Sequence, residues 1–204
     1  MPGQDLLADP LRERWSISVY DASHQLTDAQ LEAVLQAARW SSSAGNTQPW
    51  RFVVCPRGSE QHALLVGTLS RGNSGWVPRA SAVVVTAVQT GPDPDDPETD
   101  PGPKSPAHAL YDLGQAAAHL TVQAHATGLH AHPFAGFDAD ALADLLGVPP
   151  HWRLMTGIAL GVPGDPGEVD PRDAEREQRP RTRKPLGEIA YAARWGEPWE
   201  PTRD

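Results

Sequence analysis

Four short segments, far apart in the chain, gather residue types that can bind a ligand. An extended stretch near the N-terminus carries Arg14 and Ser16, a cation and a hydroxyl one residue apart. A loop of small polar residues, 41–50, leads into a predicted strand. A Gly-Phe-Asp bend at 136–138 follows the longest predicted helix, and a cationic run, 181–185, lies near the C-terminus. Each segment alone could be a solvated helix end, a turn or an exposed arm, so only their combination points to a function.

Other common sites of chemistry are missing from the sequence. It contains no glycine-rich loop for a dinucleotide or a phosphate and no Gly-x-Ser-x-Gly turn for a nucleophilic serine. The histidines do not show the spacing of metal ligands, since His119 and His125 fall on different faces of a helix. His130 and His132 alternate along an extended segment. We therefore predict no metal site and expect surface or packing histidines.

Composition and charge narrow the class of protein. The 204 residues, 39% hydrophobic and 21% charged, fit one domain over residues 1–204. A net charge of -9 without a basic stripe argues against nucleic acid and anionic membranes as partners. No apolar stretch approaches the roughly 18 residues of a spanning helix, and the N-terminus lacks signal-peptide regions, so a cytoplasmic protein is expected. Cys55, the single cysteine, ends an apolar run and is expected to be buried and inert.

Hydrophobic periodicity and capping residues predict an α+β order of elements. Thr27 and Gln30 form a capping box at one helix start, and Gly128 ends the longest helix. The predicted elements are a short helix within 8–20, a helix near 28–40, strands at 50–55 and 82–88, the long helix 107–127, a helix between Asp138 and Gly147, and a strand at 152–162. This order lacks regular β-α-β alternation and predicts a central mixed or mostly antiparallel sheet flanked by helices.

Two Pro-rich segments and one helix suggest further features. Residues 90–106 are acidic and Pro-rich, which predicts a mobile loop. The segment 164–204 is polar but contains Trp195 and Trp199, which indicates an extended arm that packs against a partner subunit. Small residues at 114–118 of the long helix would let another helix approach closely, in the core or at a dimer interface.

Together the four segments resemble the nitroreductase family over nearly the full length of the chain. The family pattern is Arg-x-Ser, a polar loop ending in Asn-x-Gln-Pro-Trp, a Gly-Phe-Asp turn and a basic Arg-x-Arg-x-Pro segment. The corresponding segments here are Arg14–Ser16, Ser41–Trp50, Gly136–Asp138 and Arg181–Pro185. The resemblance implies the α+β nitroreductase fold, with a C-terminal arm exchanged in a homodimer and FMN bound at the interface.

The resemblance also implies which residues hold FMN. Arg14, Arg181 and Arg183 would neutralise its phosphate, because a guanidinium pairs two oxygens at once. Small polar residues of the partner's serine loop would line the ring and ribityl chain. Backbone near Gly136, which has no side chain to block the approach, would bond flavin N5. The implied cofactor-binding residues are Arg14, Trp15, Ser16, Ser18, Ser42, Ser43, Asn46, Pro133, Phe134, Ala135, Gly136, Arg181 and Arg183.

The chain departs from the family pattern at four positions. Trp15 and Ser18 stand where further basic residues are common, so two cationic contacts are lost. Ser42 occupies a usual proline position. Ala135 stands where an acidic residue often lies beside the flavin, so only its backbone can contribute.

The function implied by the resemblance is an FMN-dependent oxidoreductase. It would pass hydride from NAD(P)H, the co-substrate, to an electron-poor acceptor such as a nitroaromatic or a quinone, by a ping-pong mechanism. The flavin would carry the chemistry, so no catalytic side chain is predicted. Two alternatives stay open: a flavin-dependent tailoring dehydrogenase of a small metabolite or peptide, and a non-catalytic flavin-binding protein.

Overall fold

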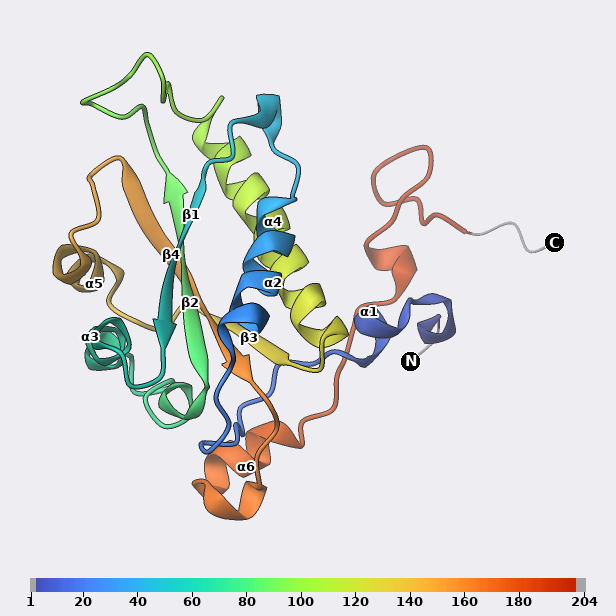
Figure 1. Cartoon of the computed structure of the whole chain (residues 1–204). Helices are drawn as coiled ribbons and strands as arrows, with labels where there is room; N and C mark the ends of the chain where they lie inside the picture. Colours follow the sequence, from blue (N-terminus) through green and yellow to red (C-terminus); the bar gives the residue numbers. More distant parts are fainter. Residues whose placement is uncertain (1–2, 201–204) are drawn as a thin grey trace.

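The computed structural model describes residues 3–200 and contains an antiparallel four-stranded sheet between helices (Figure 1). The ends of the predicted domain, residues 1–2 and 201–204, lie outside the described part. The strand order is β1-β2-β4-β3, and every neighbouring pair is antiparallel. The strands are β1 (Trp50–Pro56), β2 (Ala82–Gln89), β3 (His130–Phe134) and β4 (Trp152–Gly161). The predicted α+β class with a largely antiparallel sheet is confirmed.

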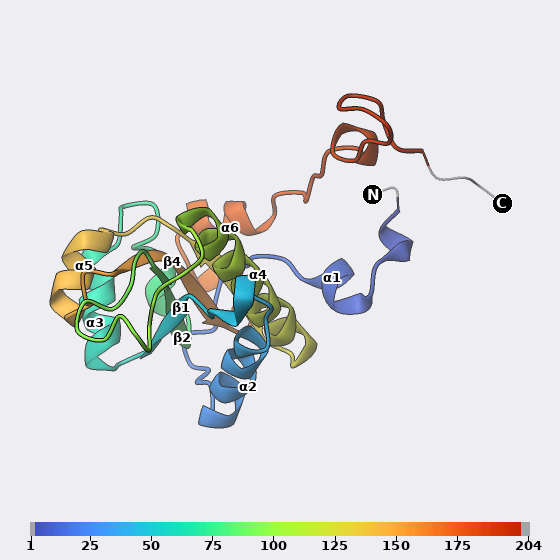
Figure 2. The ribbon, with the colours of Figure 1, turned by 90° about the horizontal axis from the view of Figure 1, so that it is seen from above.

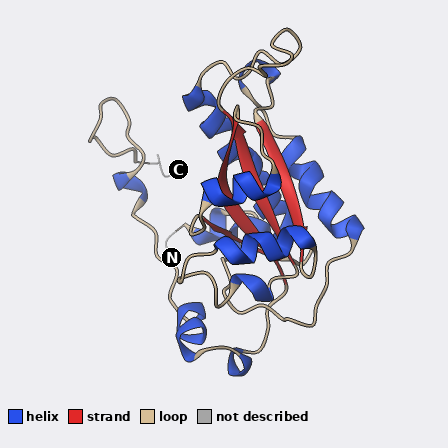
Figure 3. Ribbon diagram, turned by 90° about the vertical axis from the view of Figure 1, so that its left-hand side faces the viewer, coloured by secondary structure: helices blue, strands red, loops and turns tan. Residues whose placement is uncertain are grey.

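Strand β2 is the centre of the core because all eight of its residues are buried. Its alternate side chains point to opposite faces of the sheet. Val84 and Val88 face a layer formed by α2 (Asp28–Arg39) and α4 (Pro106–Ala126). Val83 and Val85 face the layer of α3 (Glu60–Thr68) and α5 (Ala139–Leu146), as Figure 3 shows from the side. Burial on both faces explains why this strand reads as a continuous apolar run.

Cys55 of β1 lies in the core beside α3, as predicted for a buried thiol. Burial raises the pKa of the Cys55 thiol to about 11, because the thiolate would lose its hydration there.

The helix ends follow the sequence signals. Thr27 accepts a hydrogen bond from the Gln30 backbone, and the Gln30 side chain accepts one from the Thr27 backbone, which confirms the capping box. Gly128 and Gly147 follow α4 and α5 with φ of 82° and 65°, conformations that favour glycine. Helix α3 was missed because only two of its nine residues are buried, so its apolar periodicity is weak.

Strand β3 was also missing from the predicted order, although its residues were expected to be extended. It is five residues long, lies at one edge of the sheet and pairs only with β4. Two of its five residues are histidines, so its sequence lacks the apolar and β-branched signal of the buried strands.

The acidic segment 90–106 folds back on itself. A Cβ atom at Gly102 would lie 2.7 Å from the backbone of Gly91, and the Asp93 amide donates to the Asp100 carbonyl at 3.0 Å. The Gln89 side chain donates to the Asp100 carboxylate at 2.6 Å. These contacts bring the two ends of the loop together; its mobility stays a prediction.

The first and the last of the described residues lie on the same side of the molecule, away from the sheet (Figures 1 and 2). Within the predicted arm, the chain first forms helix α6 (Pro171–Glu177) and then leaves the body beside α1 (Asp9–Glu13). Trp195 is 91% exposed. Exchange of this arm between subunits stays a prediction. No helix within residues 3–200 combines the length and apolar character needed to cross a membrane.

Candidate functional site

The N-terminal extended segment lies along the edge strand β3. The Ile17 carbonyl is 2.6 Å from Nδ1 of His132, and since a carbonyl only accepts, Nδ1 carries the proton and donates. Further along, Tyr20 forms an isolated bridge with Pro163. Trp15 packs edge-on to His130 with ring centroids 4.6 Å apart. These contacts hold the segment that carries Arg14 against the sheet.

Three of the predicted cations converge. Arg181 donates from Nη1 to the carbonyls of Arg12 at 2.9 Å and Arg14 at 2.8 Å, across 167 residues of sequence in the second case. Burial, followed by the positive charges of Arg183 and Arg181, lowers the pKa of Arg14. Nε of Arg14 is buried and has no hydrogen-bond partner within residues 3–200. A cluster of like charges around the partly buried Arg14, with an unpaired donor, fits an anionic ligand.

This cationic cluster, Arg14, Arg181 and Arg183, borders a cavity of about 390 Å³. Arg12 also reaches the cavity, but its guanidinium is already paired with Asp9 and Glu13. The remaining wall is largely aliphatic and is formed by Leu6, Leu7, Leu11, Leu186 and Ile189. The cavity therefore combines cationic and apolar surface.

The other residues of the N-terminal pattern have protein partners. The Ser16 hydroxyl accepts a hydrogen bond from Arg14 at 3.4 Å, which places the predicted cation and hydroxyl together. Ser18 is buried, and its backbone amide donates to the carboxylate of Glu177. The indole N–H of Trp15 donates to the same carboxylate at 2.8 Å.

The bend after β3 is held by a loop that the sequence did not single out. The carbonyl of Gly136 accepts from the Ser70 amide at 2.9 Å and from the Asn73 side chain at 3.0 Å. A Cβ atom at position 136 would lie 2.5 Å from the Ser70 hydroxyl and from the Asn73 amide nitrogen, so any other residue would displace these side chains. The Gly136 amide has no acceptor among the described residues. Asn73 is one polar residue in a loop of small residues, so no sequence pattern could have identified it.

The other residues of the bend differ in exposure. Phe134 is buried and packs edge-on to Trp76 with centroids 5.6 Å apart. Pro133 and Ala135 are exposed. The bend therefore presents backbone and small side chains to solvent and anchors itself through Phe134.

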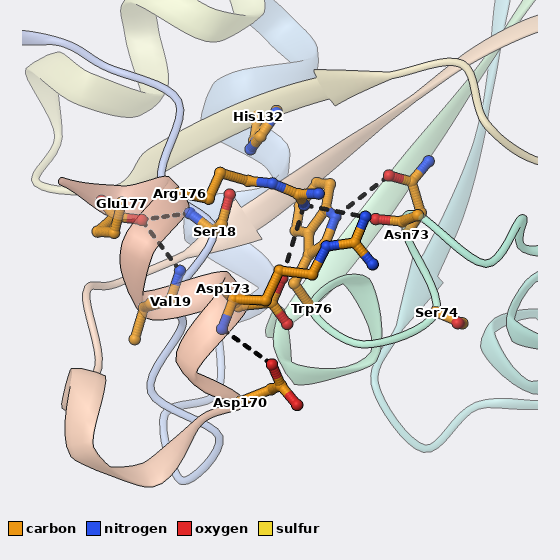
Figure 4. A network of polar contacts seen from close by, with 12 residues as sticks. Ser18, Val19, Asn73, Ser74, Trp76, His132, Asp170, Asp173, Arg176 and Glu177 are labelled. Atoms are coloured by element: carbon orange, nitrogen blue, oxygen red, sulfur yellow. Dashed lines mark hydrogen bonds and ion pairs between the residues drawn. The ribbon is translucent and has the colours of Figure 1, made fainter. Parts of the chain in front are cut away.

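The rings of His132 and Trp76 stack with centroids 4.3 Å apart, and the side chain of Arg176 from α6 lies beside Trp76 (Figure 4). Burial lowers the pKa of His132; the bond to Ile17 acts in the opposite direction, and Arg176 lowers the pKa further. Arg176 also contacts the 70–75 loop through the Gly72 carbonyl at 3.4 Å. Helix α6 thus covers the region between the N-terminal segment and the loop that holds Gly136.

The serine loop lies elsewhere in the same chain. Ser42 donates to Gln115 at 3.2 Å, and the hydroxyl of Ser43 accepts from the Gln48 amide at 3.0 Å. The Ala44 amide donates to Asp112 at 3.0 Å, and Asn46 has a left-handed backbone with φ 58°. These contacts fix the loop on the N-terminal half of α4.

The cationic cluster, by contrast, is near the other end of α4. His125 stacks edge-on with His130, which in turn contacts Trp15. At 1.5 Å per residue, positions 115 and 125 are separated by about 15 Å along the helix. A single chain therefore does not join Ser42, Ser43 and Asn46 to the arginines (Figure 1). Within residues 3–200, no three His, Cys, Asp or Glu side chains converge as a metal site requires.

Comparisons with known proteins match this chain to one family model. The model of the nitroreductase family matches residues 11–162. An uncharacterized 15.4 kDa protein in the ask 5′ region of Mycolicibacterium smegmatis is 38% identical over 156 residues, 72% of this chain and 99% of that protein. A crystal structure described as an oxidoreductase containing FMN is 32% identical, with a TM-score of 0.83 over 94% of each chain.

A shorter similarity involves the oxygen-insensitive NADPH nitroreductase of Helicobacter pylori strain 26695. It is 41% identical over 44 residues, 22% of this chain and 21% of that enzyme. The matched fold and the extent of the family match identify the class of protein. The chain belongs to the nitroreductase family, which supports an oxidoreductase activity.

The lowered pKa of His132 predicts that the protein loses stability in mild acid. Below about pH 6.5 the unfolded chain binds a proton at this residue more readily than the folded chain does. The free energy of unfolding should therefore decrease as the pH is lowered. Above that pH the histidine is neutral in both states and contributes no slope. His132→Asn keeps a donor for the Ile17 carbonyl and should flatten the decline in melting temperature between pH 7.5 and 5. The exposed His119→Asn serves as the control, and equal slopes for wild type and His132→Asn would refute this origin.

Proposed function

We propose that this chain is an FMN-dependent oxidoreductase that accepts hydride from NAD(P)H and passes it to an electron-poor acceptor such as a nitroaromatic or a quinone. The observation that carries the proposal is the convergence of Arg14, Arg181 and Arg183 at one cavity. The similar structure described as containing FMN and the similar segment of an NADPH nitroreductase are consistent with it.

The cationic cluster fits the phosphate of FMN. A dianionic phosphate beside Arg14 would offset the repulsion among the three guanidinium groups and give the buried Nε a partner. Ser16, already in contact with Arg14, would add a hydroxyl. Guanidinium groups suit this ligand because their planar forks bond two phosphate oxygens.

The bend at 133–136 fits the ring of the flavin. The amide of Gly136 is unpaired within the described residues and would donate to flavin N5, while Ser70 and Asn73 hold its carbonyl in place. Bound FMN would supply the chemistry, accepting hydride at N5 and releasing it there. Pro133, Phe134 and Ala135 would line the ring, and Trp15 and Ser18 would support the phosphate end of the site through the N-terminal segment.

A homodimer would join the two halves of this site. The exposed face of α4 carries Leu110, Gly114 and Ala118, four residues apart, an apolar stripe with small side chains. If two copies of α4 pack antiparallel about a two-fold axis, the N-terminal half of one lies beside the C-terminal end of the other. Ser42, Ser43 and Asn46 of one subunit would then reach the cationic cluster of its partner.

The C-terminal arm has a surface on which a partner could receive it. An open groove of about 620 Å³ lies between α2 and the edge strand β1 and exposes apolar side chains that include Leu35 and Phe52. Trp195 and Trp199 of the arm are exposed within one chain. We propose that these aromatic residues pack on the partner subunit.

The absorbance spectrum of the purified protein, followed by anaerobic addition of NADH or NADPH, tests the function. The expected result is an oxidised flavin spectrum that is bleached rapidly by at least one nicotinamide and restored by an acceptor. Because both half-reactions would use one pocket, double-reciprocal plots should give parallel lines.

Slow bleaching by both nicotinamides would favour a tailoring dehydrogenase, and a bound flavin without acceptor-dependent NAD(P)H consumption would favour a flavin-binding protein. Colourless protein that does not bind added FMN would contradict the proposal.

Removal of one guanidinium should weaken FMN binding strongly. Arg14→Ala is expected to lose roughly 1.5–3 kcal/mol of binding free energy, because hydrogen bonds to charged groups contribute on that order. Arg14→Lys keeps the charge but not the planar fork of the guanidinium, so its FMN affinity should lie between those of Arg14→Ala and the wild type. Arg153→Ala changes an exposed arginine of β4 and is the matched control. Titration of flavin fluorescence measures all three, and an unchanged affinity in Arg14→Ala would argue against a phosphate site.

Deletion of the chain from Gly187 onward should yield monomers that lose flavin. The truncated protein should still fold, because none of the buried core residues lies beyond Leu160. Light scattering after gel filtration gives the mass, and absorbance gives the flavin content. A truncated protein that remains dimeric and yellow would refute the proposed role of the arm.

A further inference from the structure

We propose that Glu177 is a positioning residue for the cationic cluster, holding the N-terminal segment where Arg14 meets Arg181 and Arg183. The inference builds on the proposed FMN site and concerns the phosphate end alone. Glu177 is the last residue of α6, and nothing in the sequence pattern singles it out.

The carboxylate of Glu177 accepts three hydrogen bonds from one short stretch. The indole of Trp15 donates to Oε1 at 2.8 Å, and the backbone amides of Ser18 and Val19 donate to Oε2 at 2.5 and 3.2 Å. Figure 4 shows the two backbone contacts. Charge-assisted bonds of this kind are stronger than bonds between neutral groups. Segments about 160 residues apart in the chain are thereby joined at one side chain.

Arg181 forms a second junction between the same two segments. It lies four residues after Glu177 and donates to the carbonyls of Arg12 and Arg14. The N-terminal segment is therefore fixed on both sides of Arg14, by Arg181 at its carbonyls and by Glu177 at the amides that follow. A flexible arginine binds more tightly when its backbone is already in place, because less conformational entropy is lost on binding.

The charge of Glu177 indicates that its function is geometric. A carboxylate cannot attract a phosphate, and the charges that shift the pKa of Arg14 are those of Arg183 and Arg181. Its oxygens instead satisfy backbone amides that would otherwise be left without an acceptor in a half-buried segment. Trp15, at a position where the family commonly has a basic residue, becomes part of the same junction.

Comparison of FMN with riboflavin, which lacks the phosphate, tests this role. Glu177→Ala should weaken FMN binding by about tenfold or more, the loss expected for hydrogen bonds to a charged group. Riboflavin affinity should change little, so the preference for FMN over riboflavin should shrink. At saturating FMN, kcat and the KM for the nicotinamide should stay at wild-type values. A merely structural defect would weaken both flavins together.

Two further variants keep the test decisive. Glu177→Gln is isosteric and retains one acceptor oxygen, so it should give an intermediate preference and decides the question if Glu177→Ala does not fold. Glu175→Gln removes the same charge from an exposed position of α6 and should behave as wild type. An undiminished preference for FMN in Glu177→Gln and Glu177→Ala would overturn the role of Glu177. A wild-type protein that binds neither flavin would instead contradict the proposed function.

Discussion

Like charges repel, so three guanidinium groups stay together only where other contacts hold the segments that carry them. Two junctions do this: Arg181 binds the carbonyls of Arg12 and Arg14, and Glu177 binds the amides that follow. Burial and repulsion lower the pKa of Arg14, because its charged form loses hydration and faces two like charges. The proposed FMN site follows from this constraint, since a phosphate would relieve the repulsion.

The sheet positions the remainder of the site through its edge strand. Because β3 pairs with β4 on one side only, its other side is free to receive the N-terminal segment, through His132 and Ile17. The chain then bends at Gly136, where the absence of a side chain admits the loop that carries Ser70 and Asn73. One edge strand thus positions the cationic cluster near its first residue, His130, and the bend after its last, Phe134.

The position of the serine loop gives a structural reason for the proposed homodimer. The loop is tied to Asp112 and Gln115, while the cationic cluster is near the C-terminal end of the same helix. A rigid helix cannot bring its two ends together. A second copy, packed antiparallel, could supply to each cluster the loop that its own chain keeps distant.

The sequence by itself determined what depends on near neighbours. The capping box at Thr27, the glycines after α4 and α5 and the fully buried β2 depend on a few neighbouring residues, so their patterns could be read directly. The order of the four motifs also sufficed to identify the family. Only the tertiary structure decided that β3 is an edge strand, that Asn73 fills the space beside Gly136 and that Glu177 joins the chain ends. Those contacts link residues 63 to 162 positions apart, and no local pattern encodes a partner at that distance.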